Sequence, residues 1–138
     1  MMNEFETERL AELIERKLAC LTELCEMGKL QLQLVRGGEM TSLLNVLSAK
    51  QRVIERLQGV EKDLTPFRAQ TPQSRRWRTE LHRRKCAKQI EMCESLLREI
   101  LEREKQGESE LVRRRDEAAS QLNGARQAGR TVGAYAET

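Results

Sequence analysis

Apolar residues recur every three to four positions along most of this 138-residue chain, with charged or polar residues between them. Because that spacing places apolar side chains on one face of a helix, it predicts amphipathic helices rather than strands. We expect helices at about residues 3–36, 39–67 and 72–122. The first two have the most regular apolar stripes, which are Leu10, Leu13, Ile14, Leu18, Leu21, Leu24, Cys25, Leu32 and Val35, then Met40, Leu43, Leu44, Leu47, Ile54 and Leu57.

Local signals mark the ends of the first helix. Asn3 and Glu6 have the spacing of a capping box, in which each side chain accepts a hydrogen bond from the backbone N–H of the other residue. Gly37 and Gly38 favour a chain reversal, because glycine is costly inside a helix and suited to a turn. The second helix is therefore expected to return antiparallel to the first, as a helical hairpin.

The third helix is expected to begin at Thr71 and Pro72, with threonine as the N-cap and proline at the first helical position. Its apolar stripe weakens at Glu104 and Gly107, so a kink or break near Gly107 is consistent with the pattern. The stripe resumes with Leu111, Val112, Ala118, Ala119 and Leu122.

The composition changes at Asn123, where glycines increase and large apolar residues become rare. We expect residues 123–138 to be poorly ordered alone and to become helical when a partner covers their apolar face. The predicted fold is all-α: an elongated antiparallel hairpin plus a long third helix, as a three-to-four-helix bundle or coiled coil. Residues 1–122 would form the bundle and residues 123–138 a flexible tail.

Charged residues make up 34% of the chain, and only two Phe, one Trp and one Tyr are present. Few aromatic residues limit the core that such a chain can build. No apolar run approaches the roughly 20 residues that cross a bilayer, and residues 1–9 lack the basic-then-apolar order of a signal peptide. We therefore expect a cytoplasmic protein without membrane insertion.

The chain has few of the residues that a metal site or a catalytic site would need. Cys20, Cys25, Cys86 and Cys93 have no CxxC spacing and lie in or beside the apolar stripes, so we expect core thiols. His82 is the only histidine, and it shares a helix face with Cys86, but a zinc site needs more ligands. Since no catalytic arrangement and no phosphate-binding loop is found, we expect neither an enzyme nor a cofactor or metal.

A basic segment at residues 75–88 contains Arg75, Arg76, Arg78, Arg83, Arg84, Lys85 and Lys88, against Glu80 alone. Such a segment is consistent with a solvated helix face, an acidic protein surface or a nucleic acid. Nucleic acid is the weakest of these interpretations, because Trp77 is the only aromatic residue in the segment.

Three long stripes and a weak fourth leave the bundle incomplete. An amphipathic helix from another protein would complete it, but so would a second copy of the chain in a homodimer or longer coiled coil. The spacing alone favours neither solution.

Two runs of residues carry a resemblance to a known family. The first is Leu34, Gly38, Glu39, Met40, Leu43, Leu44, Leu47, Lys50, Gln51, Ile54 and Leu57. The second is Cys86, Cys93, Glu94, Leu96, Leu97, Glu99 and Glu104, followed by Arg114, Arg115 and Asp116. With the leucines of the first helix, these runs resemble the FlgN-type flagellar export chaperones over about residues 5–122.

This resemblance implies a cytosolic type III secretion chaperone of the flagellum, with no enzymatic activity and no cofactor. Its clients would be hook–filament junction proteins of the FlgK and FlgL type, bound through their C-terminal helices and kept from assembling early. The residues that it implies for client capture are Leu111, Val112, Ala118, Ala119, Leu122 and Val132. Tyr135 would help docking at an export gate protein of the FlhA type. Nucleic-acid binding through residues 75–88 and a self-associating structural coiled coil are the alternatives.

Overall fold

The computed structural model describes residues 3–137, with side chains for residues 3–127, and it confirms the all-α fold class. Three long helices and one short 3₁₀ turn make up this part of the chain, and residues 3–137 contain no β-strand. Within residues 3–137, no helix is both long and apolar enough to cross a bilayer.

Helix α1 spans Glu4–Gly37. The predicted capping box is present, since Glu6 N–H donates to Asn3 Oδ1 at 3.0 Å and Asn3 N–H donates to Glu6 Oε2 at 3.2 Å. At the other end, Gly38 has a φ of 69°, in the left-handed region. This conformation ends the helix and reverses the chain, because only glycine adopts it without a steric penalty.

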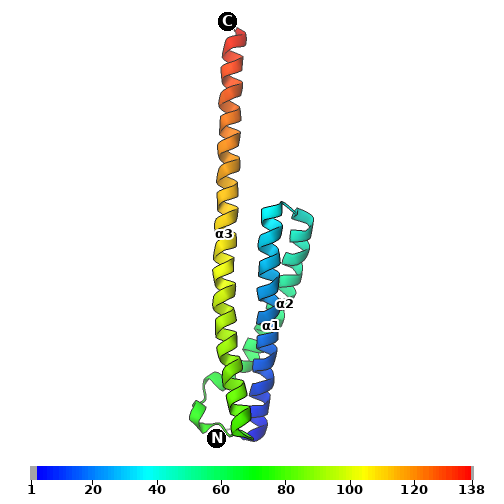
Figure 1. The fold of residues 1–138 in the computed structure, drawn as a ribbon, viewed down its shortest axis with the longest axis vertical. Helices are drawn as coiled ribbons and strands as arrows, with labels where there is room; N and C mark the ends of the chain where they lie inside the picture. The colour runs from blue at the N-terminus through cyan, green and yellow to red at the C-terminus, as the bar shows by residue number, and fades with distance from the viewer. Residues whose placement is uncertain (1–2, 138) are drawn as a thin grey trace. The chain divides into compact units, whose positions relative to one another are not determined.

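Helix α2 spans Met40–Arg68 and runs antiparallel to α1, side by side with it (Figure 1). Pro66 lies in its last turn. A proline this close to a helix end shortens the helix rather than breaking it, because few residues follow whose hydrogen bonds it disturbs. The hairpin predicted from the two apolar stripes is therefore present.

The predicted start of the third helix is wrong. A short turn and an extended segment occupy the residues where the helix was expected to begin. Thr71 and Pro72 begin only the 3₁₀ turn η1, Pro72–Ser74, and the chain is extended at Arg75. Helix α3 spans Glu80–Glu137. Its first turn is capped by Thr79, whose Oγ1 accepts a hydrogen bond from His82 N–H at 3.2 Å. The start shifts because Thr79 supplies a second N-cap signal downstream of the first.

Helix α3 continues through Gly107 without the break that the fading stripe suggested. A glycine inside a helix costs about 1 kcal/mol relative to alanine but does not by itself bend the backbone. The helix also includes residues 123–137, so the backbone of the expected tail is helical up to Glu137.

The chain divides into two compact units, residues 1–103 and residues 104–138, whereas we expected a boundary at residue 122. Unit 1 contains α1, α2, the connector and residues 80–103 of α3. Unit 2 contains the rest of α3.

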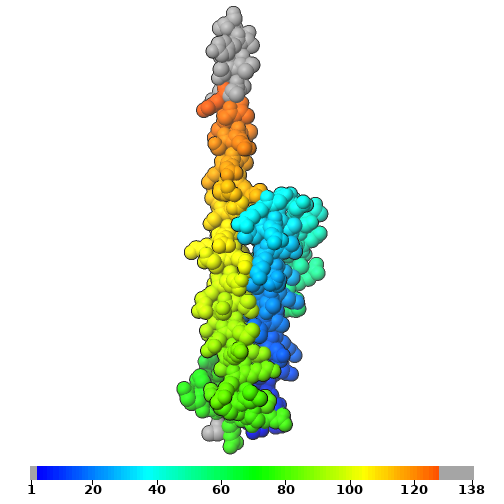
Figure 2. Space-filling model, in the orientation of Figure 1, coloured from blue at the N-terminus to red at the C-terminus, as the bar shows by residue number. Residues whose placement is uncertain are grey.

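The core of unit 1 consists of two apolar clusters. The first contains Leu10, Leu13, Ile14, Leu64 and Cys86, and the second contains Cys20, Leu21, Leu24, Val53 and Cys93. Because each cluster combines residues from all three helices, residues 80–103 pack on the hairpin, alongside α1 in Figure 2. The four cysteines are buried free thiols, as their positions in the stripes predicted.

One buried residue of unit 1 is charged. Lys50, which interrupts the apolar stripe of α2, is only 9% exposed, and its Nζ donates to Gln31 Oε1 at 3.1 Å. Burial lowers the pKa of this amine. The hydrogen bond between Lys50 and Gln31 is therefore a polar contact between α1 and α2 on the side of the hairpin turn.

Candidate functional site

Unit 2 is a single helical segment in which several of the described charged side chains pair with one another. Glu110 lies between two arginines, 2.7 Å from Arg113 and 3.4 Å from Arg114, and Arg113 also lies 3.2 Å from Glu117. The hydrogen bond from Arg113 lowers the pKa of Glu110. Pairs spaced three or four residues apart add a few tenths of a kcal/mol each to a helix. They favour the helix but do not bury any apolar surface.

The predicted capture residues of unit 2 lie on this helix with their apolar side chains in solvent. Leu111 is 52% exposed, Val112 is 40% exposed and Leu122 is 54% exposed. Ala118 and Ala119 are exposed as well. We call these five residues the capture face.

At about 100° per residue, the capture face contains two adjacent lines of side chains. Leu111, Ala118 and Leu122 form one line, and Val112 and Ala119 form the other. Arg115 lies between the lines and reaches Asp116 at 3.4 Å. The face is therefore amphipathic and has a charge near its middle.

The remaining predicted residues are Val132 and Tyr135. Their backbone belongs to α3, but their side chains lie outside the described residues. All seven predicted residues thus belong to α3, and the structure describes the side chains of five of them. The roles of Val132 and Tyr135 stay predictions.

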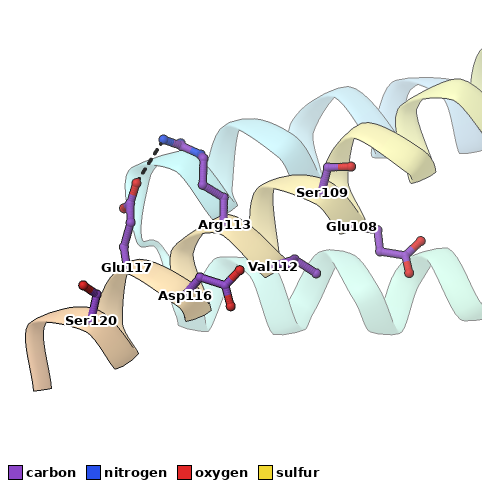
Figure 3. A pocket seen from close by; sticks show the side chains of 7 residues that line it. All are labelled: Glu108, Ser109, Val112, Arg113, Asp116, Glu117 and Ser120. Carbon is purple, nitrogen blue, oxygen red and sulfur yellow. Dashed lines mark hydrogen bonds and ion pairs between the residues drawn. The ribbon is translucent and has the colours of Figure 1, made fainter. Parts of the chain in front are cut away.

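A shallow hollow of about 660 Å³ lies along one side of unit 2 (Figure 3). Val112 is its only large apolar residue, and the other lining residues are Glu108, Ser109, Arg113, Asp116, Glu117 and Ser120. Every lining residue comes from the same helix, and Arg113 is paired with Glu117 across it. Such a hollow is surface relief on one helix rather than an enclosed ligand site.

Sequence reasoning missed a second set of exposed apolar side chains, in unit 1. Met40 and Leu44 of α2 are each 62% exposed, although their stripe predicted burial. Leu43, between them in sequence, is buried. The stripe near the hairpin turn is wider than the surface that α1 covers, so only part of it enters the core.

The basic segment lies in the connector and the first turns of α3, within unit 1. Glu80 accepts hydrogen bonds from Arg83 Nε at 2.9 and 3.0 Å, and it lies 3.4 Å from Arg84. The bond from Arg83 is the main reason why the pKa of Glu80 is lowered. Arg78 lies 3.8 Å from Glu8 of α1.

A pocket of about 380 Å³ opens beside this segment and is lined by Pro72, Gln73, Arg75, Trp77 and Arg83. One Nη of Arg75 donates to the carbonyl of Phe67 at 3.0 Å. Arg75 Nε is buried and has no hydrogen-bond partner among the described residues. The pocket therefore combines two guanidinium groups with one indole ring.

The cysteines and the histidine do not form a chemical site. His82 is exposed and near Thr79, whereas Cys86 is in the core. Burial raises the pKa of the Cys20, Cys86 and Cys93 thiols, which disfavours the nucleophilic thiolate. In the part of the chain that the structure describes, no three His, Cys, Asp or Glu residues are grouped so that they could bind a metal ion.

Comparisons of this chain with protein-family models, with curated proteins and with solved structures find no match.

Proposed function

We propose that this chain is a cytoplasmic chaperone of flagellar type III secretion, of the FlgN type that its leucine pattern resembles. It would bind the C-terminal helical region of a hook–filament junction protein of the FlgK or FlgL type. The observation that carries the proposal is the capture face, because unit 2 is one helix with two exposed leucines and an exposed valine.

A helix of this composition is expected to be marginal by itself. Isolated helices owe little stability to propensity, and most helices in proteins depend on packing of an apolar face. Burying one leucine side chain contributes about 1.5–3 kcal/mol. A client helix that covered the capture face would therefore stabilise unit 2 and be bound by the same contacts.

The capture face suits one helix packed along another. Leu111 and Leu122 are eleven residues apart, or about 16 Å along the axis, which is about three turns of a partner helix. Recognition of an amphipathic helix through apolar residues at helical spacing is a common mode of peptide binding. Arg115 between the two lines favours a client helix with an acidic residue at the matching position.

Delivery would follow capture. In this proposal Val132 extends the capture surface, and Tyr135 docks on an export gate protein of the FlhA type. Binding, shielding and release are the whole activity, so the proposal requires neither an enzymatic step nor a cofactor. A contact in which unit 2 gains order on binding also favours release, because ordering offsets part of the interaction energy.

The test is binding of a purified C-terminal helical segment of a junction protein to the chain and to a Leu111→Asp, Leu122→Asp variant. Loss of two leucines that the client helix would bury is expected to cost about 3 kcal/mol or more, which is a Kd increase of roughly a hundredfold or more. Isothermal titration calorimetry measures the Kd, and circular dichroism measures the helix content of each protein.

The matched control is Ser109→Asp with Gln121→Asp, which adds the same two charges to exposed polar positions of the same helix. The control is expected to bind as tightly as the unmodified chain. Equal weakening in both variants would contradict the capture face, and a collapse of helix content in the leucine variant alone would show that these leucines belong to a core.

A further inference from the structure

One side of α3 in unit 1 combines exposed cations with exposed apolar side chains, and it has no role in the proposed capture of a client helix. Leu81 is 75% exposed and Met92 is 45% exposed, although both are large apolar residues. Three exposed cations lie between them in sequence and on the same side of the helix. We call these five residues the basic stripe: Leu81, Arg84, Lys85, Lys88 and Met92.

The basic stripe is narrow and faces away from the buried cysteines of α3. At about 100° per residue, its five positions fall within about 100° of the helix circumference. Each of them is about 80° or more away from Cys86 and Cys93, which enter the core. Arg83, which is bound by Glu80, lies on the other side of the helix and does not belong to the stripe.

The cations of the basic stripe outnumber the carboxylates that neutralise them. Lys85 and Lys88 are exposed and form no ion pair within the described residues. Arg84 shares the single carboxylate of Glu80 with Arg83. The stripe therefore offers positive charge to a partner.

The spacing of the basic stripe is that of a helix-packing seam. Leu81, Lys85, Lys88 and Met92 are separated by four, three and four residues, which is the alternation found where two helices pack along each other. The seam is about 16 Å long, or about three turns. Its ends are apolar and its middle is cationic, so the complementary helix has apolar ends and an acidic middle.

We propose that the basic stripe binds an amphipathic helix of a partner protein, with apolar residues at positions i and i+11 and acidic residues at i+4 and i+7. The acidic residues pair with Lys85 and Lys88, and the apolar residues cover Leu81 and Met92. The spacing reads the same in both directions, so a parallel and an antiparallel helix present the same pattern. The site belongs entirely to unit 1 and does not depend on the capture face.

A single helix fits this surface better than a nucleic acid or an anionic membrane does. Glu80 and the exposed Glu91 lie along one edge of the stripe, so an extended anionic surface would meet their carboxylates, whereas one helix covers the stripe alone. The stripe has no aromatic side chain on which a base could stack. Its two large apolar side chains are also few for insertion into a bilayer, which requires a continuous apolar face.

The probe is a helix-stapled peptide of about 18 residues, or about five turns, built from alanine and glutamine. It contains leucine at positions i and i+11 and glutamate at i+4 and i+7. The fluorescence anisotropy of the labelled peptide is measured while the full chain is added. We expect saturable binding that weakens as the salt concentration rises, since exposed charges are screened beyond about 8 Å at 0.15 M ionic strength.

The decisive variant is Lys85→Glu with Lys88→Glu, which reverses two exposed charges. Its affinity for the glutamate peptide is expected to fall about tenfold or more, and it is expected to bind instead a peptide with lysine at i+4 and i+7. The matched control is Arg52→Glu with Arg98→Glu, which changes the net charge equally at exposed positions outside the stripe. The control is expected to bind the glutamate peptide like the unmodified chain.

Two further variants separate the apolar contacts from the capture face. Leu81→Ser with Met92→Ser is expected to weaken binding of the glutamate peptide about tenfold or more, because it removes the apolar ends of the seam. Leu111→Asp with Leu122→Asp is expected to leave this binding unchanged, since the capture face belongs to unit 2. Circular dichroism is expected to show the same helix content in every variant, because all the substituted residues are exposed.

Four results would overturn this assignment. One is the absence of saturable binding of the glutamate peptide to the unmodified chain. Another is equal binding of a peptide whose two glutamates are moved to the opposite helix face, which would show only non-specific attraction of anions. The third is binding that Lys85→Glu with Lys88→Glu leaves unchanged. The fourth is displacement of the peptide by oligothymidylate or by phosphatidylglycerol vesicles at a lower concentration of charge than unlabelled peptide requires, which would identify a nucleic-acid or membrane surface.

Discussion

Thr7 shows how a single buried hydroxyl positions the connector that contains the basic segment. The residue is 1% exposed, and its Oγ1 lies 2.6 Å from the carbonyl of Arg76 and 2.9 Å from that of Glu4. The bond to Arg76 ties the connector to α1 across 69 positions of sequence. The sequence around Thr7 does not predict this role, because nothing in the neighbouring residues indicates which distant carbonyl the hydroxyl meets.

We predict that Thr7→Val destabilises the protein by about 1–3 kcal/mol, because it leaves the carbonyl of Arg76 without its donor. Urea unfolding followed by circular dichroism measures the free energy of unfolding. Thr7→Ser keeps the hydroxyl and serves as the control, with a smaller loss from the missing methyl group. Equal stability of Thr7→Val and the unmodified chain would show that the hydroxyl is not needed.

The buried thiols give a pH dependence with a definite sign. Burial raises the pKa of Cys86 and Cys93, so the folded state keeps these protons to a higher pH than the unfolded state. Their contribution to stability is fully present below the unfolded thiol pKa of about 8.5 and is lost as the pH rises through the folded value.

We therefore predict that the free energy of unfolding falls between pH 7 and pH 9.5, and that Cys86→Ala with Cys93→Ala makes this fall smaller. The variant starts from a lower stability at pH 7, because it loses two buried side chains, so the comparison uses the slope. Lys50, whose pKa is lowered, acts in the opposite direction, but it is present in both proteins. An unchanged slope in the variant would rule out the thiols as its source.

Among the helices and their connections, the turn between α1 and α2 contains two adjacent glycines that have different roles. Gly38 has a positive φ, whereas Gly37 is the last residue of α1. A Cβ on Gly37 would meet only the Glu39 side chain, at 3.6 Å. The sequence predicted the reversal but not which of the two glycines requires the left-handed conformation.

We predict that Gly38→Ala destabilises the protein by about 1–2 kcal/mol, since an L-residue is strained at this φ. Gly37→Ala, the matched control, is expected to be neutral or to stabilise by up to about 1 kcal/mol. Thermal unfolding of both variants measures the difference. Equal melting temperatures for the two variants would contradict this assignment of the turn.

The accuracy of the predicted elements follows the strength of their local signals. The ends of α1 depend on a capping box and a glycine, both local, and they are where the sequence placed them. The start of α3 moved from Pro72 to Glu80 because two threonines offer N-caps and tertiary contacts of the connector decide between them. Gly107 interrupts the apolar stripe, but the helix continues through it. A weak stripe by itself therefore does not predict a bend.

At the scale of the whole molecule, periodicity predicted the helices but not which apolar residues they bury. Cys86 and Cys93 were expected in the core and are there. Met40 and Leu44 belong to the apolar stripe of α2 and were expected to be buried. They are exposed instead, because burial depends on which helix lies opposite. The residues of the capture face were predicted from a family resemblance, and Leu111, Val112 and Leu122 are exposed.

We propose that the capture face binds a client helix rather than a second copy of the chain. The most direct measurement is the mass in solution by light scattering after gel filtration in high salt, for the chain alone and for the chain mixed with a junction protein's C-terminal segment. We predict a monomer for the chain alone and a one-to-one complex with the segment, and we expect Leu111→Asp with Leu122→Asp to abolish the complex. A dimer whose mass is unchanged by the segment would contradict it and would identify the chain as a self-associating coiled coil.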